Sequence, residues 1–591
     1  MANNPTGTRV KFIFFLSCVF VGVGISNLIL QGLGLPAVYS LTFKVPSTRG
    51  KIFDVYGRLC AYDEIVYSAY LDVDFLKSRF KERLMPHLKL LIANFSLPYS
   101  PEQLLSNSKR FVKLGQAKER DELLSKVPTE LIPFVSIEYE TVRKRFEDYG
   151  MGKILGKVID GKGFGGVEEA LNSTLARQKD GKIRIRYKGF LTTTLVIETI
   201  ASPRNGKDIS LTIDLDLQKI AYEEIKNAVQ KNRAVSGGVI ILETKTGKIR
   251  AMVTTREWND AIMGYFEPGS AIKPIVYAIA LEEKIVDLQT IFQCEGKIKP
   301  IDDVDIVVRD LYVHGKVDLT EALVESCNSA TILLARQIKE KLGDYNYYQW
   351  LEKFGFGKPT KVQLAGEISG VLRKPESWSK IDFAMISIGQ SIGTTPLQFA
   401  AAFNTIANRG VYVAPTIIED FETEKRKVLS PEVCDKIVQI LHQVVERGTG
   451  VRAKVPNVGI AGKTGTAQKV AAGEDKYYSI FAGFFPYEDP QYTILVWLDE
   501  PSANAYLAGE VAAPIFAKIV QRITKLSREQ VISFQEGLMP DLRGLTVKDA
   551  LFILKQLNVE EIEIVGTGIV KNQYPPPGSV ELEKVILFLG Y

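Results

Sequence analysis

The stretch Glu267-Pro268-Gly269-Ser270-Ala271-Ile272-Lys273-Pro274 decides how the rest of the chain is interpreted. Proline is tolerated in a helix only in the first turn, so Pro274 predicts a helix that begins near Ser270 after a Pro-Gly loop. Lys273 then follows one turn later on the same face. A serine at a helix N-terminus lies beside unpaired backbone N–H groups, and a buried lysine of depressed pKa can accept its proton. The stretch therefore predicts a nucleophilic serine with a lysine base.

Two further motifs downstream give this one its weight. Ser-x-x-Lys alone is weak evidence, because it also occurs at Ser78/Lys81, Ser106/Lys109 and Ser377/Lys380. The Ser270 motif, however, is followed in order by Ser326-Cys327-Asn328 on a predicted helical stretch and by Lys463-Thr464-Gly465-Thr466 in a predicted strand. Cys327 is a weaker candidate nucleophile, since no Cys-His partner lies near it in the sequence.

The middle motif supplies partners for the lysine. The Ser326 hydroxyl can relay a proton between Lys273 and a leaving amine. The Asn328 amide can hold Lys273 and exchange hydrogen bonds with a substrate amide. The predicted catalytic group is therefore Ser270, Lys273, Ser326 and Asn328.

The third motif predicts a substrate-binding strand. Lys463 supplies positive charge, and the hydroxyls of Thr464 and Thr466 can bind a peptide carboxylate. Gly465 lets a substrate backbone approach the edge of the strand. Two similar segments are set aside by position: Lys245-Thr246-Gly247 precedes Ser270 and predicts a hairpin turn, and Ser502-Ala503-Asn504 lies in a later loop.

Composition disfavours several other classes of protein. The chain is 46% hydrophobic and 24% charged with a net charge of +5, and it has no basic block, so nucleic acid is not an expected partner. The glycine run at 161–166 lacks a βαβ setting and an acidic partner, which disfavours a dinucleotide site. The histidines and cysteines have no paired spacing, so we expect neither a metal site nor a cofactor. These residues are His87, His314 and His442, and Cys18, Cys60, Cys294, Cys327 and Cys434, of which Cys327 and Cys434 are expected to be buried and reduced.

The N-terminus predicts the compartment. Arg9 and Lys11 precede residues 12–30, which contain no charge. At about 1.5 Å per residue, a helix of this length nearly spans a hydrocarbon core of roughly 30 Å. No small-x-small cleavage site follows, and positive charge ahead of the run keeps the tail cytoplasmic. We expect a cytoplasmic tail at 1–11, a single transmembrane anchor helix at 12–31 and an extracytoplasmic body.

The body divides into three parts. Residues 32–205 mix short strand-like pieces with charged stretches at 74–85 and 138–150 that predict helices. Residues 206–530 begin with a strand and a helix opened by Asp216, and hold further helical segments from Ser270 to about 430. Their β-rich runs lie at 237–243, 248–254, 458–466, 479–485 and 492–498. Two early and three late strands predict one antiparallel five-stranded sheet flanked by helices, an α+β fold.

The tail, 538–591, predicts a separate small module. Thr546 is a suitable N-cap, with Asp549 three residues on, for an apolar-periodic helix that ends near Leu557. Strands at 561–565 and 584–589 flank a turn-forming Pro-Pro-Pro-Gly segment at 575–578. The pattern predicts a βαββ-like arrangement.

At these motifs the chain resembles class B penicillin-binding proteins, and its tail resembles a PASTA domain. Further segments carry the resemblance from residue 49 to 516: Arg49-Gly50-Lys51-Ile52-Phe53-Asp54, then Gly163 with Gly166-Val167-Glu168, Ser387-Ile388-Gly389-Gln390-Ser391, Thr395-Pro396-Leu397-Gln398 and Ala512-Ala513-Pro514-Ile515-Phe516. The chain departs from the family pattern at Val55-Tyr56-Gly57, where Arg-Asn-Gly is usual, and at Ser391, which replaces a glycine.

The resemblance implies a penicillin-binding transpeptidase fold, with an elongated N-terminal pedestal at 32–205 and a transpeptidase domain at 206–530. It implies that Ser270 attacks the penultimate D-Ala carbonyl of a stem peptide, with an oxyanion hole formed by the backbone N–H groups of Ser270 and Thr466. An amine on another stem then resolves the acyl-enzyme. β-Lactams are implied inhibitors, and lipid II-derived glycan strands are the implied source of the stems.

The PASTA-like tail and the early RGxIxD segment favour the division branch of the family, septal or sporulation, over the elongation branch. A polytopic glycan polymerase and other division proteins are then implied partners at the bacterial inner membrane. Two alternatives stay open. One is hydrolysis by the same residues, as a D,D-carboxypeptidase or β-lactamase; the other is a non-catalytic division scaffold or β-lactam sensor.

Overall fold

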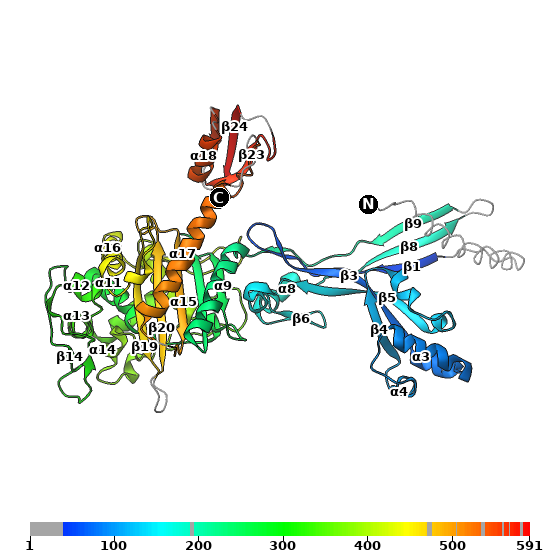
Figure 1. Ribbon diagram of the computed structural model, residues 1–591, viewed down its shortest axis with the longest axis horizontal. Coiled ribbons are helices and arrows are strands. Elements are labelled where there is room, and N and C mark those ends of the chain that lie inside the picture. The colour runs from blue at the N-terminus through cyan, green and yellow to red at the C-terminus, as the bar shows by residue number, and fades with distance from the viewer. Residues whose placement is uncertain are drawn as a thin grey trace, which may run out of the picture. The chain divides into compact units, whose positions relative to one another are not determined.

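The structure is a computed structural model that describes residues 40–188, 194–469, 476–503, 505–532, 538–545, 547–557, 559, 561–566, 568–579 and 583–590. The described residues form two compact units, which divide the chain into 1–50, 63–144 and 174–207 on the one hand and 51–62, 145–173 and 208–591 on the other (Figure 1). Among the described residues no helix is both long and apolar enough to cross a membrane, and the expected anchor at 12–31 lies outside them.

The first unit combines two small sheets with a helical layer. β1 (Ser40–Val45), β8 (Gly181–Lys188) and β9 (Thr194–Ala201) form an antiparallel sheet in that order. The second half of β3 (Leu59–Asp72) pairs with β4 (Phe111–Ala117), and β5 (Val135–Arg145) also pairs with β3. A core of leucines and valines joins β4 to α2 (Val73–Arg79), α3 (Met85–Asn94), α4 (Pro101–Leu105) and α5 (Arg120–Ser125).

Two helix predictions here need correction. The stretch 74–85 is helical only as far as Arg79, where α2 ends, and a 3-10 turn, η1 (Glu82–Leu84), follows. The stretch 138–150 is not an α-helix: most of it lies in β5, and its end forms the 3-10 turn η3 (Asp148–Gly150). Pairing with β3 satisfies the backbone of β5, so the sheet overrides the helix propensity of these charged residues.

A five-stranded antiparallel sheet forms the centre of the second unit, which confirms the prediction. Its order is β12-β11-β21-β20-β19, from β11 (Ser236–Glu243), β12 (Ile249–Thr254), β19 (Ala461–Gln468), β20 (Tyr477–Phe485) and β21 (Tyr492–Asp499). Both early strands and all three late strands take part, as expected. β19 is the last strand in this spatial order and lies at the edge of the sheet. It begins at Ala461 rather than at the predicted residue 458.

Helices cover both faces of this sheet. α9 (Leu215–Asn232) and α17 (Ala508–Ile532) lie beside one another and pack on one face (Figure 1). Val239 and Ile241 of β11 share a core with these helices, as expected for the period of two in a strand. On the other side lie α15 (Pro396–Ala407) and α16 (Pro431–Arg447). The sheet is thus buried on both faces, which gives the edge strand β19 a rigid support.

The segment between β12 and β19 carries most of the other elements. The helices and 3-10 turns are α10 (Asp260–Met263), η4 (Gly269–Ile272), α11 (Lys273–Glu282), α12 (Leu319–Val324), α13 (Asn328–Lys353), η5 (Pro375–Ser377), α14 (Asp382–Ser387) and η6 (Val451–Ala453). Short strand pairs interrupt them, which the helical prediction missed: β13 (Phe292–Cys294) with β16 (Gly315–Val317), β14 (Lys297–Ile298) with β15 (Val308–Arg309), and β17 (Val411–Val413) with β18 (Lys425–Lys427).

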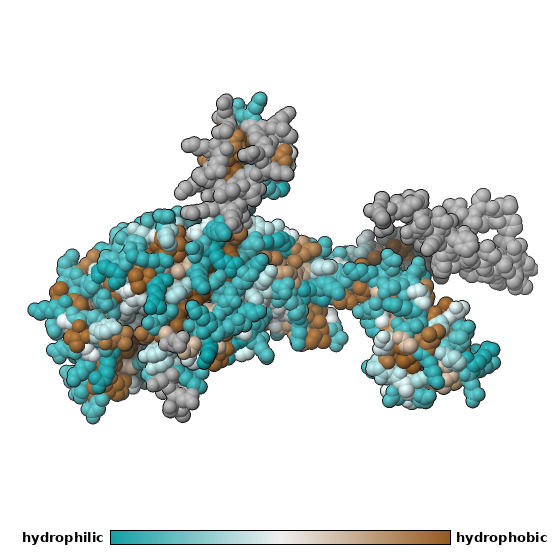
Figure 2. All heavy atoms as spheres, viewed as in Figure 1, coloured by the Kyte–Doolittle hydropathy of each residue, from teal (hydrophilic) through white to brown (hydrophobic). Residues whose placement is uncertain are grey.

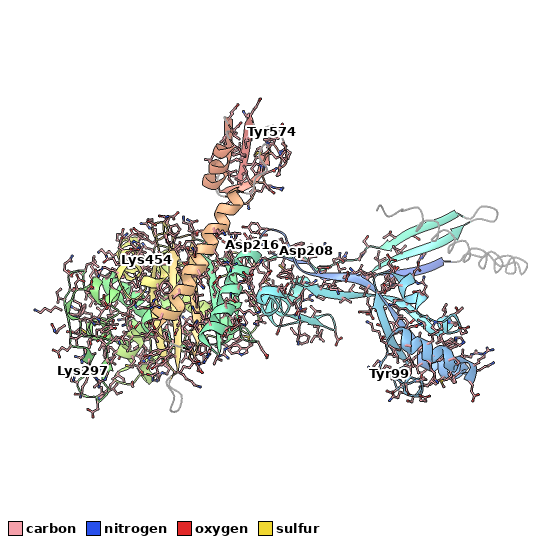
Figure 3. The ribbon with its side chains drawn as sticks, in the orientation of Figure 1. Tyr99, Asp208, Asp216, Lys297, Lys454 and Tyr574 are labelled. Atoms are coloured by element: carbon pink, nitrogen blue, oxygen red, sulfur yellow. The ribbon has the colours of Figure 1, made fainter. Side chains whose placement is uncertain are left out.

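The buried carboxylate of Asp54 organises the segment that departs from the family pattern. It accepts hydrogen bonds from the backbone N–H groups of Tyr56 and Arg58, at 3.0 and 2.8 Å, and from the Arg58 guanidinium at 2.6 Å. Arg58 also contacts Asp214, which caps α9, and Asp216 (labelled in Figure 3). Residues 55–57 therefore form a turn whose geometry depends on Asp54 and on the positive φ of Gly57.

The glycine run near 163 has a packing explanation. α6 (Met151–Leu155), β6 (Lys157–Ile159), β7 (Lys162–Phe164) and α7 (Gly166–Ala170) fold closely together. A Cβ on Gly163 would lie 1.8 Å from the Glu168 carbonyl oxygen, and one on Gly166 would lie 2.2 Å from that of Ile154. Only glycine permits these approaches, so close packing accounts for the run.

The tail has a hydrophobic core of its own. α18 (Val547–Gln556) precedes β22 (Glu561–Val565), β23 (Ile569–Tyr574) and β24 (Lys584–Gly590), which pair in the order β22-β24-β23. The helix and both predicted strands are confirmed. The additional strand β23 follows β22, so the described tail has the order αβββ rather than βαββ.

Candidate active site

Ser270 lies at the predicted entrance to a helix. The entrance is a 3-10 turn, η4, which runs directly into α11 at Lys273. Gly269 has φ +52°, a left-handed conformation that reverses the chain before the serine. Ser270 is half-buried, whereas Lys273 is completely buried. The nucleophile candidate is thus partly accessible to solvent, whereas the candidate base is not.

Lys273 reaches the middle motif. Its Nζ donates to the Ser326 carbonyl oxygen at 2.6 Å and to Asn328 Oδ1 at 2.7 Å, and lies 3.5 Å from Ser326 Oγ. Burial lowers the pKa of Lys273 to about 8, although the nearby Cys327 and Asp310 act in the opposite direction. The neutral amine, the form that can act as a base, is therefore far more populated at neutral pH than it is for an exposed lysine.

Ser326 does not lie on a helix, contrary to the prediction. It occupies the turn between α12 and α13, with φ 59°. Left-handed backbone costs a non-glycine residue roughly 1–2 kcal/mol, and such residues cluster at functional sites. The conformation turns the Ser326 hydroxyl toward two lysines, while Asn328 begins α13.

The second of these lysines is Lys463, which is also completely buried. Its Nζ donates to Ser326 Oγ at 2.9 Å and to the Thr464 carbonyl oxygen at 3.2 Å. Burial, and then the charge of Lys273, lower the pKa of Lys463 well below its usual value. One hydroxyl, Ser326 Oγ, thus connects two buried amines from distant parts of the chain.

The edge strand β19 lies against the Ser270 turn. A Cβ on Gly465 would approach the Pro268 carbonyl oxygen to 2.5 Å, and one on Gly269 would approach the Thr466 carbonyl oxygen to 2.7 Å. The absence of a side chain at Gly465 is therefore required for the contact between β19 and the Ser270 turn. The close approach brings Thr466, which is half-buried, beside Ser270. All eight predicted site residues belong to the three segments that meet here.

Sequence reasoning missed several residues that support the site. The carbonyl oxygen of Gly389 accepts from the Gly269 N–H at 3.0 Å, and a Cβ on Gly389 would lie 2.1 Å from the Gly269 oxygen. Glu267 accepts from the Ser391 N–H at 2.9 Å, which holds Ser391 at φ 58°. Thr449 Oγ1 lies 2.8 Å from Thr464 Oγ1. Gly389 and Ser391 belong to a segment that carries the family resemblance, although no role was predicted for them. No sequence signal marks Thr449.

The similar motifs elsewhere have local structural roles. The hydroxyls of Ser78, Ser106 and Ser377 each donate to the carbonyl oxygen three residues earlier. Residues 244–247 form the predicted hairpin turn, closed by the Gly247 N–H on the Glu243 carbonyl oxygen at 2.9 Å. Ser502 donates to the Arg233 carbonyl oxygen at 3.0 Å, and Asn504 lies outside the described residues.

The cysteine prediction is confirmed for burial, and the structure brings together histidine and cysteine side chains that lie far apart in the sequence. Cys327 and Cys434 are buried thiols, as expected. However, Cys327 lies in a cluster with Cys294, Asp310 and His314, whose candidate ligand atoms all fall within 4.8 Å of one another. The expectation of no metal site rested on linear spacing, and that spacing did not reveal this cluster.

Known proteins resemble the chain at this site and beyond it. The penicillin binding protein transpeptidase domain matches residues 237–521, and the PASTA domain matches 537–590. Peptidoglycan D,D-transpeptidase FtsI of Buchnera aphidicola subsp. Baizongia pistaciae is 30% identical over 520 residues, covering 81% of this chain and 87% of that protein. Penicillin-binding protein PbpB of Mycolicibacterium smegmatis is 31% identical over 461 residues, covering 70% of this chain and 69% of that protein.

Solved structures share the fold. Penicillin binding protein 3 from Mycobacterium tuberculosis, complexed with aztreonam, has a TM-score of 0.61 at 24% identity, covering 82% of this chain and 97% of that one. The site geometry, the domain matches and the length of the aligned relatives lead to one conclusion. This chain belongs to the penicillin-binding protein transpeptidases and carries a PASTA domain at its C-terminus.

Proposed function

We propose that the chain is a peptidoglycan D,D-transpeptidase that forms its acyl-enzyme on Ser270. The observation that carries the assignment is the pair of buried amines, Lys273 and Lys463, that meet at the Ser326 hydroxyl beside the Ser270 turn. Two buried amines raise the electrostatic cost of protonation, and this favours a neutral base next to a nucleophile.

In the acylation step, the neutral amine of Lys273 takes the proton of Ser270 as the serine oxygen attacks the penultimate D-Ala carbonyl. The backbone N–H groups of Ser270 and Thr466 would stabilise the oxyanion. The C–N bond to the terminal D-Ala then breaks, and Ser326 passes the proton from Lys273 to the departing amine. The left-handed turn at Ser326 supports this role, because it aims the hydroxyl at Lys273.

Substrate binding falls to the edge strand. A donor peptide would add to the edge of β19 through backbone hydrogen bonds, with Gly465 keeping the strand close to the Ser270 turn. Its terminal carboxylate would bind Lys463, Thr464 and Thr466. An arriving carboxylate favours the charged form of a nearby amine, so binding would return a proton to Lys463. This reconciles a carboxylate-binding role with the lowered pKa of the free site.

An acceptor amine from a second stem then attacks the acyl-enzyme, takes the place of Ser270 at the carbonyl and restores the hydroxyl. Hydrolysis by water would make the same site a D,D-carboxypeptidase or a β-lactamase. The name of the FtsI relative, together with its match over 81% of this chain, favours transfer over hydrolysis. β-Lactams are expected to acylate Ser270 as substrate mimics.

The proposal includes a cellular setting. The charge-free run at 12–30 behind Arg9 and Lys11 supports a single-pass anchor with the catalytic body outside the cytoplasm. In that setting the acceptor and donor stems come from lipid II-derived strands, and a polytopic glycan polymerase with other division proteins would act alongside. The PASTA domain and the FtsI relative favour a septal role.

A transpeptidation assay separates these functions. The full-length chain in detergent is incubated with pentapeptide donor strands and an amine acceptor, and products are resolved by mass spectrometry. Cross-linked dimer that disappears in Ser270→Ala supports the proposal, with Ser377→Ala as the matched control that keeps activity. Tetrapeptide without dimer would indicate a carboxypeptidase. Neither product, under conditions where a known transpeptidase is active, would favour the scaffold or sensor.

A further inference from the structure

We propose that Cys294, Asp310, His314 and Cys327 bind one zinc ion that holds the Ser326 turn in its catalytic conformation. The candidate ligand atoms of all four residues lie within 4.8 Å of one another. Two thiols, an imidazole and a carboxylate form a donor set typical of tetrahedral zinc sites. The catalytic role of the turn rests on the function proposed above, whereas the metal site itself does not.

Two of the distances between ligand atoms match those of a zinc shell. Cys294 Sγ lies 3.5 Å from Asp310 Oδ2 and 3.3 Å from His314 Nδ1. In a tetrahedral zinc shell, bond lengths of about 2.0–2.3 Å place neighbouring ligand atoms about 3.5 Å apart. Cys294 and Cys327 are completely buried, whereas Asp310 and His314 are partly exposed, which leaves a side from which an ion can enter.

Charge also favours a cation. On binding, the two thiols release their protons to solvent, so zinc would be held by two thiolates, one carboxylate and one neutral imidazole, with a net charge of −1. The Asp310 carboxylate has supporting partners that orient it, as metal ligands generally do. Its Oδ2 accepts from the Ser329 N–H at 3.1 Å and from Ser329 Oγ at 2.5 Å, and its Oδ1 accepts from the Asn328 N–H.

The loop between β13 and β16 has little regular structure, and it is held mainly by packing of Ile298, Ile301 and Val308 against α13 and α14. Between β13 and β16 the described chain contains only the two-residue pair β14 and β15, located by Lys297 in Figure 3. Leu311, Tyr312 and Val313, between two of the ligands, are 71%, 73% and 71% exposed, and hydrophobic surface is visible at this end of the unit (Figure 2). A loop without a core of its own is commonly stabilised by a metal cross-link.

The cluster is joined directly to the active site. Cys327 stands between Ser326 and Asn328, and its Sγ accepts from the Ala330 N–H at 3.3 Å at the start of α13. Asn328 Nδ2 donates to the Arg309 carbonyl oxygen at 2.9 Å, next to Asp310. An ion bound by both the Asp310 loop and the Cys327 turn would restrain Ser326 at its strained φ. It would also hold Asn328 against Lys273. The four ligands act as positioning residues, since none of them touches the reacting atoms.

The first test is metal content. The full-length chain, purified without chelator or added metal and then equilibrated with zinc and desalted, is expected to hold one zinc per chain by elemental mass spectrometry. Cobalt in place of zinc is expected to show thiolate-to-metal absorption. Cys294→Ser and His314→Ala should weaken zinc binding by at least about 10–100-fold, because loss of a residue that merely hydrogen-bonds to a metal ligand already has an effect of that size. Cys434→Ser removes another buried thiol outside the cluster and should keep the zinc.

A second measurement tests the positioning role. Removal of zinc is expected to slow acylation by a fluorescent penicillin while its reversible binding constant changes little, and added zinc should restore the rate. A general loss of folding would instead weaken both, and thermal unfolding of each variant detects it. If the chain binds one zinc ion but its acylation rate does not change when the zinc is removed, the positioning role alone is overturned.

Other outcomes overturn the site itself. No bound metal, with Cys294 and Cys327 recovered as free thiols, would contradict it. A mass two hydrogens lower, with both residues in one disulfide-linked peptide, would assign the pair to a disulfide instead. Zinc retained equally by Cys294→Ser and His314→Ala would place the ion elsewhere. If Ser270 is not the nucleophile but zinc is present, the function fails and the metal site stands.

Discussion

At the scale of single residues, the site depends on burial, which disfavours the charged form of its lysines. Lys273 and Lys463 carry amines that water would keep protonated, yet both are fully buried within reach of one hydroxyl. Burial lowers both pKa values, and the charge of Lys273 lowers that of Lys463 further. The strained Ser326 holds this arrangement in place. The buried amines and the left-handed backbone of Ser326 both cost free energy, and favourable contacts in the rest of the fold must offset that cost.

The first prediction concerns pH. In the proposed mechanism the neutral form of Lys273 is the base. Because burial lowers its pKa to about 8, the acylation rate should rise with pH and reach half its maximum near that value. Stopped-flow measurement of fluorescent-penicillin acylation between pH 6 and 10 tests this. Lys273→Ala should lower the rate by about 10²–10⁴-fold. Lys380→Ala, in an unrelated Ser-x-x-Lys segment, is the matched control. A rate independent of pH throughout would contradict the assignment of the base.

At the scale of elements, the active site is a junction of three backbones. η4, the edge strand β19 and the loop at Gly389 approach so closely that no Cβ fits at Gly269, Gly389 or Gly465. α9 and α17 hold the sheet on its far side, so β19 has a fixed position from which to contact η4. The loop at Gly389 supports η4 from behind through one backbone hydrogen bond. Small residues are therefore as necessary here as the polar ones.

Gly389→Ala provides a test at this scale. Its φ of +80° and a Cβ 2.1 Å from the Gly269 oxygen should displace the Ser270 turn and destabilise it by about 1–3 kcal/mol or more. Acylation should slow strongly, and thermal unfolding should begin at a lower temperature. Gly152→Ala is the control, because a Cβ there meets nothing within 4 Å. Equal acylation by the two variants would show that the loop does not position Ser270.

Elements with strong local patterns could be predicted from sequence. The continuous apolar runs of β11, β20 and β21 predicted strands of one sheet, and Pro274 predicted a helix that starts close to the observed start of α11. The charged residues of β5 predicted a helix, because sequence alone does not show that β3 pairs with them. The turn at Ser326 and the approach of Thr449 to Thr464 likewise arise only when distant segments meet.

At the scale of the whole molecule, the chain combines parts with separate cores. The first unit has its own leucine-rich core, the central sheet has another, and residues 539–589 have a third. The side chains of the proposed active site all come from the part that contains the sheet. Separate cores predict that the parts contribute separately to stability and to function.

Removal of residues 538–591 should therefore leave acylation intact. The core of the tail is formed by its own residues, such as Met539, Ile553 and Val585, and none of the described site residues belongs to it. A chain that ends at 537 should react with fluorescent penicillin at the full-length rate and keep the main unfolding transition. Its labelling is compared with that of full-length protein at equal concentration. Slower acylation in the truncated chain would show that the tail supports the site.

The measurement that tests the central claim most directly is covalent labelling of the full-length chain by a fluorescent penicillin, followed by peptide mapping. We expect one stable adduct, on Ser270, that is absent from Ser270→Ala and present in Ser377→Ala. An adduct on any other residue, or normal labelling of Ser270→Ala, would contradict Ser270 as the nucleophile.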